Sequence, residues 1–125
     1  MIFVLRRFNL KKKNIIKHNL EYTRIIKNSK PYKFNYFIIY LEKNTNDNYK
    51  FGISVSKKLG NAVVRNKLKR QIKDIIDSKY YENSFNCIII LRKEILKKTF
   101  QEKKSALYFA LNKLSIIRED FSEKT

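Results

Sequence analysis

The sequence predicts a single-domain α+β sandwich, in which three helices pack on a central sheet. Its 125 residues, 43% hydrophobic and 14% aromatic, are enough to close one modest core. Helical and strand patterns follow in the order helix, strands, helix, strand, helix, without an internal repeat. Two glycines and one proline leave no linker that would mark a second domain. We expect a basic arm over residues 1–18, the folded domain over 19–118 and a tail over 119–125.

The first helix is predicted to begin at Asn19, directly after the basic arm. Tyr22, Ile25 and Ile26 recur at helical spacing, which indicates one apolar face. The turn-forming run at residues 28–31 contains the proline and stops the pattern. The first helix is therefore short.

Two neighbouring strands are predicted next. Residues 34–41 are rich in aromatic and β-branched side chains, and after a polar turn the pattern resumes over 49–56. In the second strand Phe51, Ile53 and Val55 share one face, because side chains alternate along a strand. That face should pack on the core, whereas the glycine and serines between these residues form a small, polar face.

A second helix follows, with Asn61 as its predicted N-cap. Apolar residues recur along it at helical spacing and make one stripe: Val64, Leu68, Ile72, Ile75 and Ile76. The continuous apolar run 86–92 has the length of a strand in a covered sheet. A last helix is expected over 100–117, with Ala106 and Ala110 allowing close approach to the sheet.

Charge gives the first indication of a partner. Lys and Arg outnumber Asp and Glu by 29 to 11, a formal net charge of +18. Frequent lysine, asparagine and isoleucine are typical of an AT-rich genome, yet that bias also enriches glutamate, and the first acid along the chain is Glu21. A folded protein tolerates so many like charges when a polyanion neutralises them, so nucleic acid is the predicted partner.

The single cysteine and the lengths of the apolar segments predict where in the cell the protein acts. The single cysteine, Cys87, forms no internal disulfide, and no Cys and His cluster offers zinc ligands, which fits a reducing compartment. The opening apolar residues 1–5 are too few for a signal-peptide core and precede the basic residues. No stretch approaches the roughly 20 apolar residues that span a bilayer. We expect a cytoplasmic protein without a membrane partner.

The densest basic patch lies between Lys57 and Lys73, with seven Lys or Arg residues and no acid. Arg65, Lys69 and Lys73 recur every fourth residue and therefore project from one side of the second helix. A plain solvated helix face is the alternative interpretation. Two features oppose it: charges are not interleaved, and cations in the first turns oppose the helix dipole unless an anion binds there.

The run from Phe51 to Arg70, FGISVSKKLGNAVVRNKLKR, resembles the signature of the bacterial ribonuclease P protein family. Weaker similarity extends to residues 19–22, 37–40 and 88–93, so the resemblance covers most of the chain. It implies a ribosomal protein S5 domain 2-like fold, with a mostly antiparallel sheet and a left-handed β-α-β crossover, an exception to the usual right-handed rule. The crossover would carry the basic helix.

The resemblance also implies a function. The chain would be the RNA-binding protein subunit of ribonuclease P, an RNA-based endonuclease that removes the 5′ leader from precursor tRNA. The catalytic RNA would use Mg²⁺ and carry the chemistry, while the protein would hold no dinucleotide or other cofactor and no metal. The implied partners are that RNA and precursor tRNA.

Two sets of site residues follow from the resemblance. The catalytic RNA would be contacted by the basic helix and the loop before it: Lys57, Lys58, Arg65, Asn66, Lys67, Lys69, Arg70 and Lys73. The single-stranded leader would lie in a cleft lined by Tyr22, Ile26 and Tyr40, where rings stack on bases. The family usually has arginine in place of Lys67, an aromatic residue in place of Ile26 and glycine in place of Ser29. Ordinary core packing is the alternative role for the cleft residues.

No catalytic residues are predicted in the chain itself. Phosphodiester cleavage by a protein generally needs clustered carboxylates or a pair of histidines, whereas His18 is the only histidine and the acids are scattered. The main alternative is a non-catalytic RNA-binding protein of the ribosome or another ribonucleoprotein. A free-standing nuclease and a cationic membrane-binding protein are further alternatives, which the missing carboxylate cluster and the core-facing apolar stripes disfavour.

Overall fold

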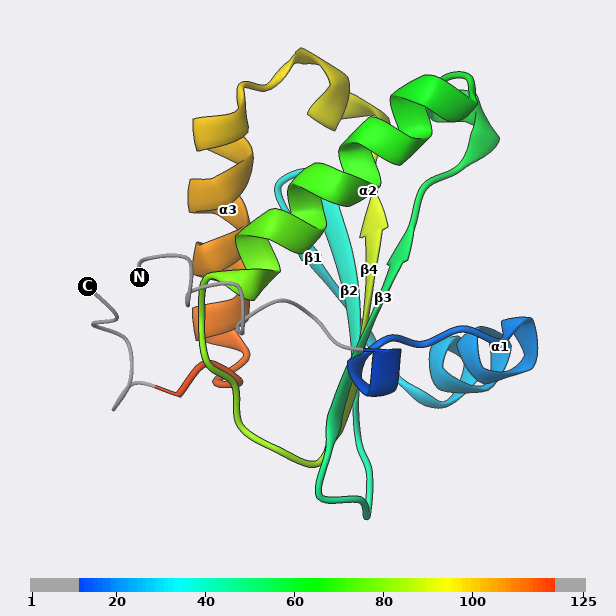
Figure 1. Ribbon diagram of the computed structural model, residues 1–125, viewed down its shortest axis with the longest axis vertical. Helices are drawn as coiled ribbons and strands as arrows, with labels where there is room; N and C mark the ends of the chain where they lie inside the picture. Colours follow the sequence, from blue (N-terminus) through cyan, green and yellow to red (C-terminus); the bar gives the residue numbers. More distant parts are fainter. Residues whose placement is uncertain (1–11, 119–125) are drawn as a thin grey trace.

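The computed structural model describes residues 12–118 and shows three helices on a four-stranded sheet (Figure 1). The first part of the predicted arm, residues 1–11, and the predicted tail, 119–125, lie outside the described residues. The helices are α1 (Asn19–Asn28), α2 (Ala62–Asp77) and α3 (Phe100–Lys113), with the short 3-10 helices η2 (Lys12–Asn14), η3 (Lys57–Leu59) and η4 (Lys93–Lys97). The strands are β1 (Pro31–Phe34), β2 (Phe37–Lys43), β3 (Tyr49–Ser54) and β4 (Phe85–Leu91). The α+β prediction is confirmed.

The strands lie in the order β1-β2-β4-β3. The β1–β2 and β2–β4 pairs are antiparallel and the β3–β4 pair is parallel, so the sheet is mostly antiparallel, as predicted. The predicted neighbours β2 and β3 are separated by β4, and that part of the prediction is wrong. The chain leaves β3, runs through α2 and returns as β4 between the two strands that precede it, which makes the parallel β-α-β crossover.

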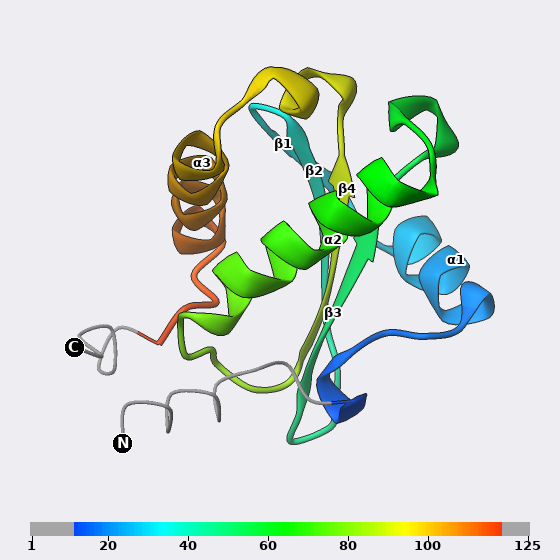
Figure 2. The same cartoon turned by 45° about the horizontal axis from the view of Figure 1, so that its top comes forward.

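The helices cover both faces of the sheet. α1 lies on one face, and α2 and α3 lie on the other (Figure 1, Figure 2). Along β4, Cys87 and Ile89 belong to the main core beneath α2 and α3, whereas Ile88 belongs to a second cluster beneath α1. All three side chains are fully buried, which explains why this strand is a continuous apolar run rather than an alternating one.

Two elements differ from the predicted ones. β1 was not expected, and the strand predicted over 34–41 spans its last residue, the turn and most of β2. β1 is a short, exposed edge strand, and it begins with Pro31, whose missing N–H is tolerated at an edge. Its turn into β2 depends on Asn35, which has a φ of 51°. α3 ends at Lys113 rather than at residue 117, because Ser115 has a φ of 61°. The chain then bends so that Ile117 pairs with Tyr81 in an isolated β-bridge.

Residues 12–18, the last part of the predicted arm, run along the outer edge of β3. The Ile15 backbone forms a parallel bridge with Phe51, and the Ile16 N–H donates to the Phe51 carbonyl at 2.9 Å. The Ile16 side chain is buried with Ile25 and Ile88 beneath α1. Because this segment leads directly into α1, its pairing with β3 helps to fix the helix on its face of the sheet.

Candidate nucleic-acid interface

The loop before α2 is held by short-range hydrogen bonds. The Ser56 hydroxyl accepts from the backbone N–H of Lys58 at 3.1 Å, and the Asn61 side chain caps α2 by accepting from the N–H of Val64 at 3.0 Å. Gly60 has a φ of 150°, and its carbonyl accepts from the Nε of Arg65 at 3.1 Å. The predicted N-cap is confirmed, and half-buried Arg65 ties the helix back to the loop.

The polar residues of α2 form three rows around the helix. Leu68, Ile72, Ile75 and Ile76 make the buried stripe, as predicted, whereas Val64, also expected in it, is exposed in the first turn of the helix. The crest opposite that stripe carries Asn66, Arg70 and Lys73, followed by the acids Asp74 and Asp77 in the last turns. Arg65 and Lys69 lie on one flank of the crest. Lys67 lies on the other, because residues two apart are turned by about 200° in an α-helix.

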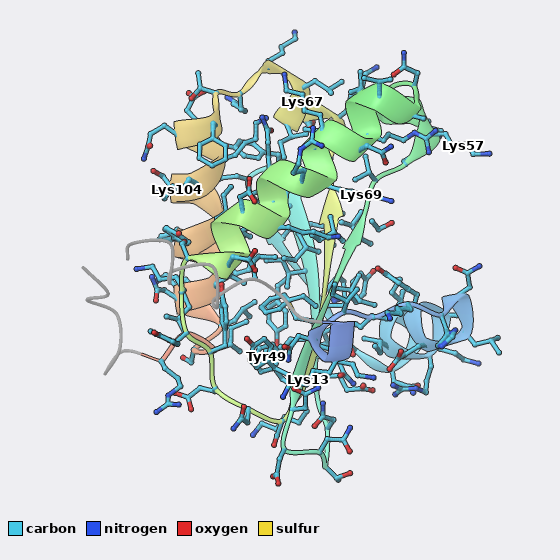
Figure 3. The ribbon with its side chains drawn as sticks, viewed as in Figure 1. Lys13, Tyr49, Lys57, Lys67, Lys69 and Lys104 are labelled. Atoms are coloured by element: carbon cyan, nitrogen blue, oxygen red, sulfur yellow. The ribbon has the colours of Figure 1, made fainter. Side chains whose placement is uncertain are left out.

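Figure 3 shows this separation of the lysines around α2. Lys67 lies on the side of the helix that faces α3, and Lys69 lies on the opposite side. Lys57 stands apart from both, at η3. The predicted RNA-contacting residues therefore lie on η3 and around α2, and they do not share a single side of the helix.

Within the described residues no ion pair involves the cations of this basic surface on η3 and α2, although exposed Asp74 follows Arg70 by four residues on the same helix. All members of the surface are exposed except half-buried Arg65. Within residues 12–118, ion pairs join Arg24 to Glu42, Lys50 to Glu21 and Arg92 to Glu94, and none involves a residue from 57 to 73. The surface thus presents unpaired cations to solvent, which suits it to bind the phosphates of a polyanion.

The predicted cleft residues come together between α1 and the sheet. Tyr22, Ile26 and Tyr40 are half-buried and pack against a fully or nearly buried cluster: Ile16, Ile25 and Ile88. Burial raises the pKa of the Tyr22 hydroxyl. The structure therefore places the three residues against one buried cluster, with part of each side chain exposed. That they hold the leader stays a prediction.

Gly52 forms the floor beneath Tyr22. A Cβ atom at this position would lie 2.6 Å from the Tyr22 hydroxyl oxygen and 2.8 Å from its Cζ atom, which is closer than real side chains approach. The ring therefore lies directly on the backbone of β3. The small, polar face predicted for this strand has a specific role, because it makes room for the aromatic ring of α1.

Two ion pairs lie beside the predicted cleft residues, whereas none is found on α2 among the described residues. Glu21 and Lys50 approach to 3.5 Å, and Arg24 donates to Glu42 at 2.7 Å. The second carboxylate oxygen of Glu42 accepts from the side-chain amide of Asn86 at 2.8 Å, which anchors the pair to β4. The predicted cleft residues therefore combine apolar and aromatic surface with two nearby ion pairs.

Sequence reasoning missed one basic residue beside α2. Lys103 of α3 is only 6% exposed, and its Nζ donates to the Gln71 side chain at 2.5 Å. Burial, and secondarily the charge of Lys67, lowers the pKa of the Lys103 amine. The signal was its spacing: Lys103 stands four residues before Leu107, on the apolar stripe of α3.

The described residues offer neither a metal site nor a helix that could span a membrane. Residues 12–118 contain no group of three or more His, Cys, Asp or Glu side chains placed to hold a metal ion. None of the helices in the same part of the chain is long and apolar enough to cross a bilayer. His18, the one histidine, precedes α1 and makes no side-chain capping hydrogen bond.

Comparison with known proteins gives one consistent family. The family model described as Ribonuclease P matches residues 10–115. The ribonuclease P protein component of Mesoplasma florum is 40% identical over 101 residues, covering 78% of this chain and 92% of that protein. The corresponding protein of Mycoplasma mycoides subsp. mycoides is 47% identical over 91 residues, covering 70% and 84%. The solved structure of the Staphylococcus aureus RNase P protein is similar with a TM-score of 0.77 at 32% identity, covering 86% of this chain and 100% of that one.

Proposed function

The chain belongs to the ribonuclease P protein family, and from that premise we propose how it acts as the protein subunit of the enzyme. The basic surface of η3 and α2 binds the backbone of the catalytic RNA. One observation carries this proposal: seven Lys and Arg residues from 57 to 73 make no ion pair within the described part of the chain. A non-catalytic ribosomal role is not favoured, because the similar proteins are ribonuclease P components.

The protein subunit contributes charge and position in this proposal, and the RNA subunit contributes the chemistry with Mg²⁺. Each phosphate that a Lys or Arg neutralises releases condensed counterions, so binding is favourable and falls as salt rises. Neutralising phosphates also reduces the amount of Mg²⁺ that the RNA needs to fold and to hold substrate. The protein should therefore help most when Mg²⁺ is scarce, in the cytoplasm where we expect it to act.

The cleft beneath α1 takes the single-stranded 5′ leader of precursor tRNA. Tyr22 and Tyr40 offer ring surface on which bases stack without regard to sequence. Their half-buried setting against Ile25 and Ile88 fixes the rings before a base arrives. In place of the usual aromatic residue, Ile26 offers an apolar contact but no stacking surface, so the two tyrosines carry this part of the proposal.

The test is cleavage of a 5′-labelled precursor tRNA at low Mg²⁺ by a bacterial ribonuclease P RNA, with and without this protein. We expect the protein to restore cleavage at the correct site, and a triple variant, Lys69→Gln, Arg70→Gln and Lys73→Gln, to lose most of that stimulation. Arg65 is kept because its bond to Gly60 shapes the loop.

A second triple variant controls for net charge. Lys30→Gln, Lys33→Gln and Lys43→Gln remove the same charge from exposed positions outside α2, and this variant should stimulate cleavage like the wild type. A wild-type protein that binds RNA but never stimulates cleavage would overturn the proposed function. Equal losses in both triple variants would instead assign the effect to overall charge rather than to α2.

A further inference from the structure

Lys103 is a buried lysine that makes no ion pair within residues 12–118. It lies near the start of α3, and only 6% of it is exposed, whereas lysines are almost never buried unless paired. A Met or Leu side chain at position 103, on the apolar stripe before Leu107, would pack equally well and would carry no charge to desolvate. Packing therefore accounts for the stem of Lys103 but not for its ammonium group.

The groups around the Lys103 ammonium leave its charge unbalanced, so an anion from outside the protein could bind there. The ammonium donates a hydrogen bond to the neutral side-chain oxygen of Gln71 on α2, at 2.5 Å. The charged neighbour is another cation, Lys67, which acts with burial to lower the pKa of Lys103. The nearest acid in sequence, Glu102, directs its carboxylate to the backbone N–H of Thr99 at 2.8 Å as part of the α3 capping box.

We propose that Lys67 and Lys103 together bind one phosphate of the RNA backbone at the seam between α2 and α3. Gln71 holds the Lys103 ammonium in place, and exposed Lys67 approaches the phosphate from the crest side. Figure 3 shows Lys67 on the side of α2 that faces α3. A phosphate in this seam would supply the missing negative charge for both lysines.

This site extends the basic surface beyond α2. The crest residues Arg70 and Lys73 and the seam lysine Lys67 lie on adjoining sides of one helix, so one RNA strand that follows the crest can reach the seam. The inference rests on the proposed function, because the anion is taken to be the ribonuclease P RNA. It adds a residue of α3 to an interface that otherwise involves η3 and α2 alone.

The test measures affinity of the full chain for a bacterial ribonuclease P RNA over a range of salt. Lys103→Met keeps the stem and removes the charge. We expect it to weaken binding about fivefold at 0.15 M salt and to reduce the log-log salt slope by about 0.7 to 0.9, the value for one phosphate contact. Lys67→Met should act similarly, and the double variant should lose less than the product of the two single effects, because both lysines serve one phosphate.

Lys104→Met is the matched control. This neighbouring lysine of α3, labelled in Figure 3, is half-buried over the Tyr108 ring at 5.9 Å from its centroid and makes no hydrogen bond to Gln71. Its replacement should leave the affinity and the salt slope near the wild-type values. Wild-type affinity and slope in folded Lys103→Met would overturn the inference, whereas failure of the wild-type chain to bind the RNA would overturn the proposed function instead.

Lys103→Arg separates RNA binding from folding. It keeps the cation, so it should bind with nearly wild-type affinity, and circular dichroism melting of each variant reports whether the chain folds. If the chain folds only with a cation at position 103, the charge is required for folding and the inference is overturned.

Discussion

The outer surface of α2 and the cleft beneath α1 differ in how the protein treats charge. Both lie against the same sheet, on opposite faces. On α2, Lys69, Arg70 and Lys73 are exposed and unpaired among the described residues. Around the cleft, Arg24 and Lys50 are paired with Glu42 and Glu21. The comparison shows that the protein pairs two of its cations beside the cleft residues and leaves those on α2 without a carboxylate partner among the described residues.

The difference predicts two kinds of binding. Contacts from unpaired cations to phosphates are strong in sum, insensitive to sequence and weakened by salt. Contacts from half-buried rings such as Tyr22 to bases are fewer, depend on a base being unstacked and change little with salt. The α2 surface should therefore supply most of the affinity for RNA, whereas the cleft should distinguish a substrate with a single-stranded leader from one without.

The largest expected effect tests the α2 side of this comparison. The triple variant Lys69→Gln, Arg70→Gln and Lys73→Gln should bind ribonuclease P RNA about 100-fold more weakly at 0.15 M salt. The log-log salt slope should fall by about 2 to 3, because three phosphate contacts are lost. Filter binding over 0.05–0.5 M salt measures both, and an unchanged slope would contradict the assignment of these residues to phosphates.

Sequence patterns predicted the strongly apolar elements well, for a physical reason. The α2 stripe from Leu68 to Ile76 and the continuous run of β4 both reflect burial, which leaves a periodic or uninterrupted apolar pattern. β1 left no such pattern, because it is four residues long and mostly exposed. The order of strands in the sheet could not be predicted either. β2 and β3 are joined by a short polar turn typical of a hairpin, yet β4, the most apolar strand, lies between them in the sheet.

The candidate sites were predictable in composition but not in geometry. The basic run identified the α2 surface, and the resemblance identified Tyr22, Ile26 and Tyr40, which the structure brings together. The contact between Tyr22 and Gly52 could not be inferred, because it joins residues 30 positions apart on different elements. Lys103 was passed over because a lysine is expected in solvent.

The second effect tests how the cleft is built. Gly52→Ala should destabilise the protein by about 1–3 kcal/mol, because the added methyl group collides with the Tyr22 ring. Urea unfolding measures this change. Ser54→Ala, on the same face of β3, is the control and should stay within about 0.5 kcal/mol of the wild type.

A rescue variant identifies the cause of that loss. Replacing Tyr22 by Ser in the Gly52→Ala background removes the ring that the methyl group meets, so the two substitutions should cost less together than the sum of their separate effects. Strict additivity would show that Gly52 is needed for β3 itself and not as the floor beneath Tyr22.

The smallest effect separates the two surfaces most directly. Tyr22→Leu keeps an apolar side chain over Gly52 but removes the stacking ring. The preference of the assembled enzyme for precursor tRNA over mature tRNA should fall about tenfold, which corresponds to roughly 1.4 kcal/mol for one stacked base, and the salt slope should not change. Equilibrium binding of both tRNAs measures the preference.

Tyr32→Leu is the control for this effect. Tyr32 pairs with Ile39 in the β1–β2 register, and Ile39 faces the core beneath α2 and α3, on the other side of the sheet. A loss of preference in both variants would contradict the cleft, whereas a loss that also lowers the salt slope would make Tyr22 part of the same electrostatic surface as α2.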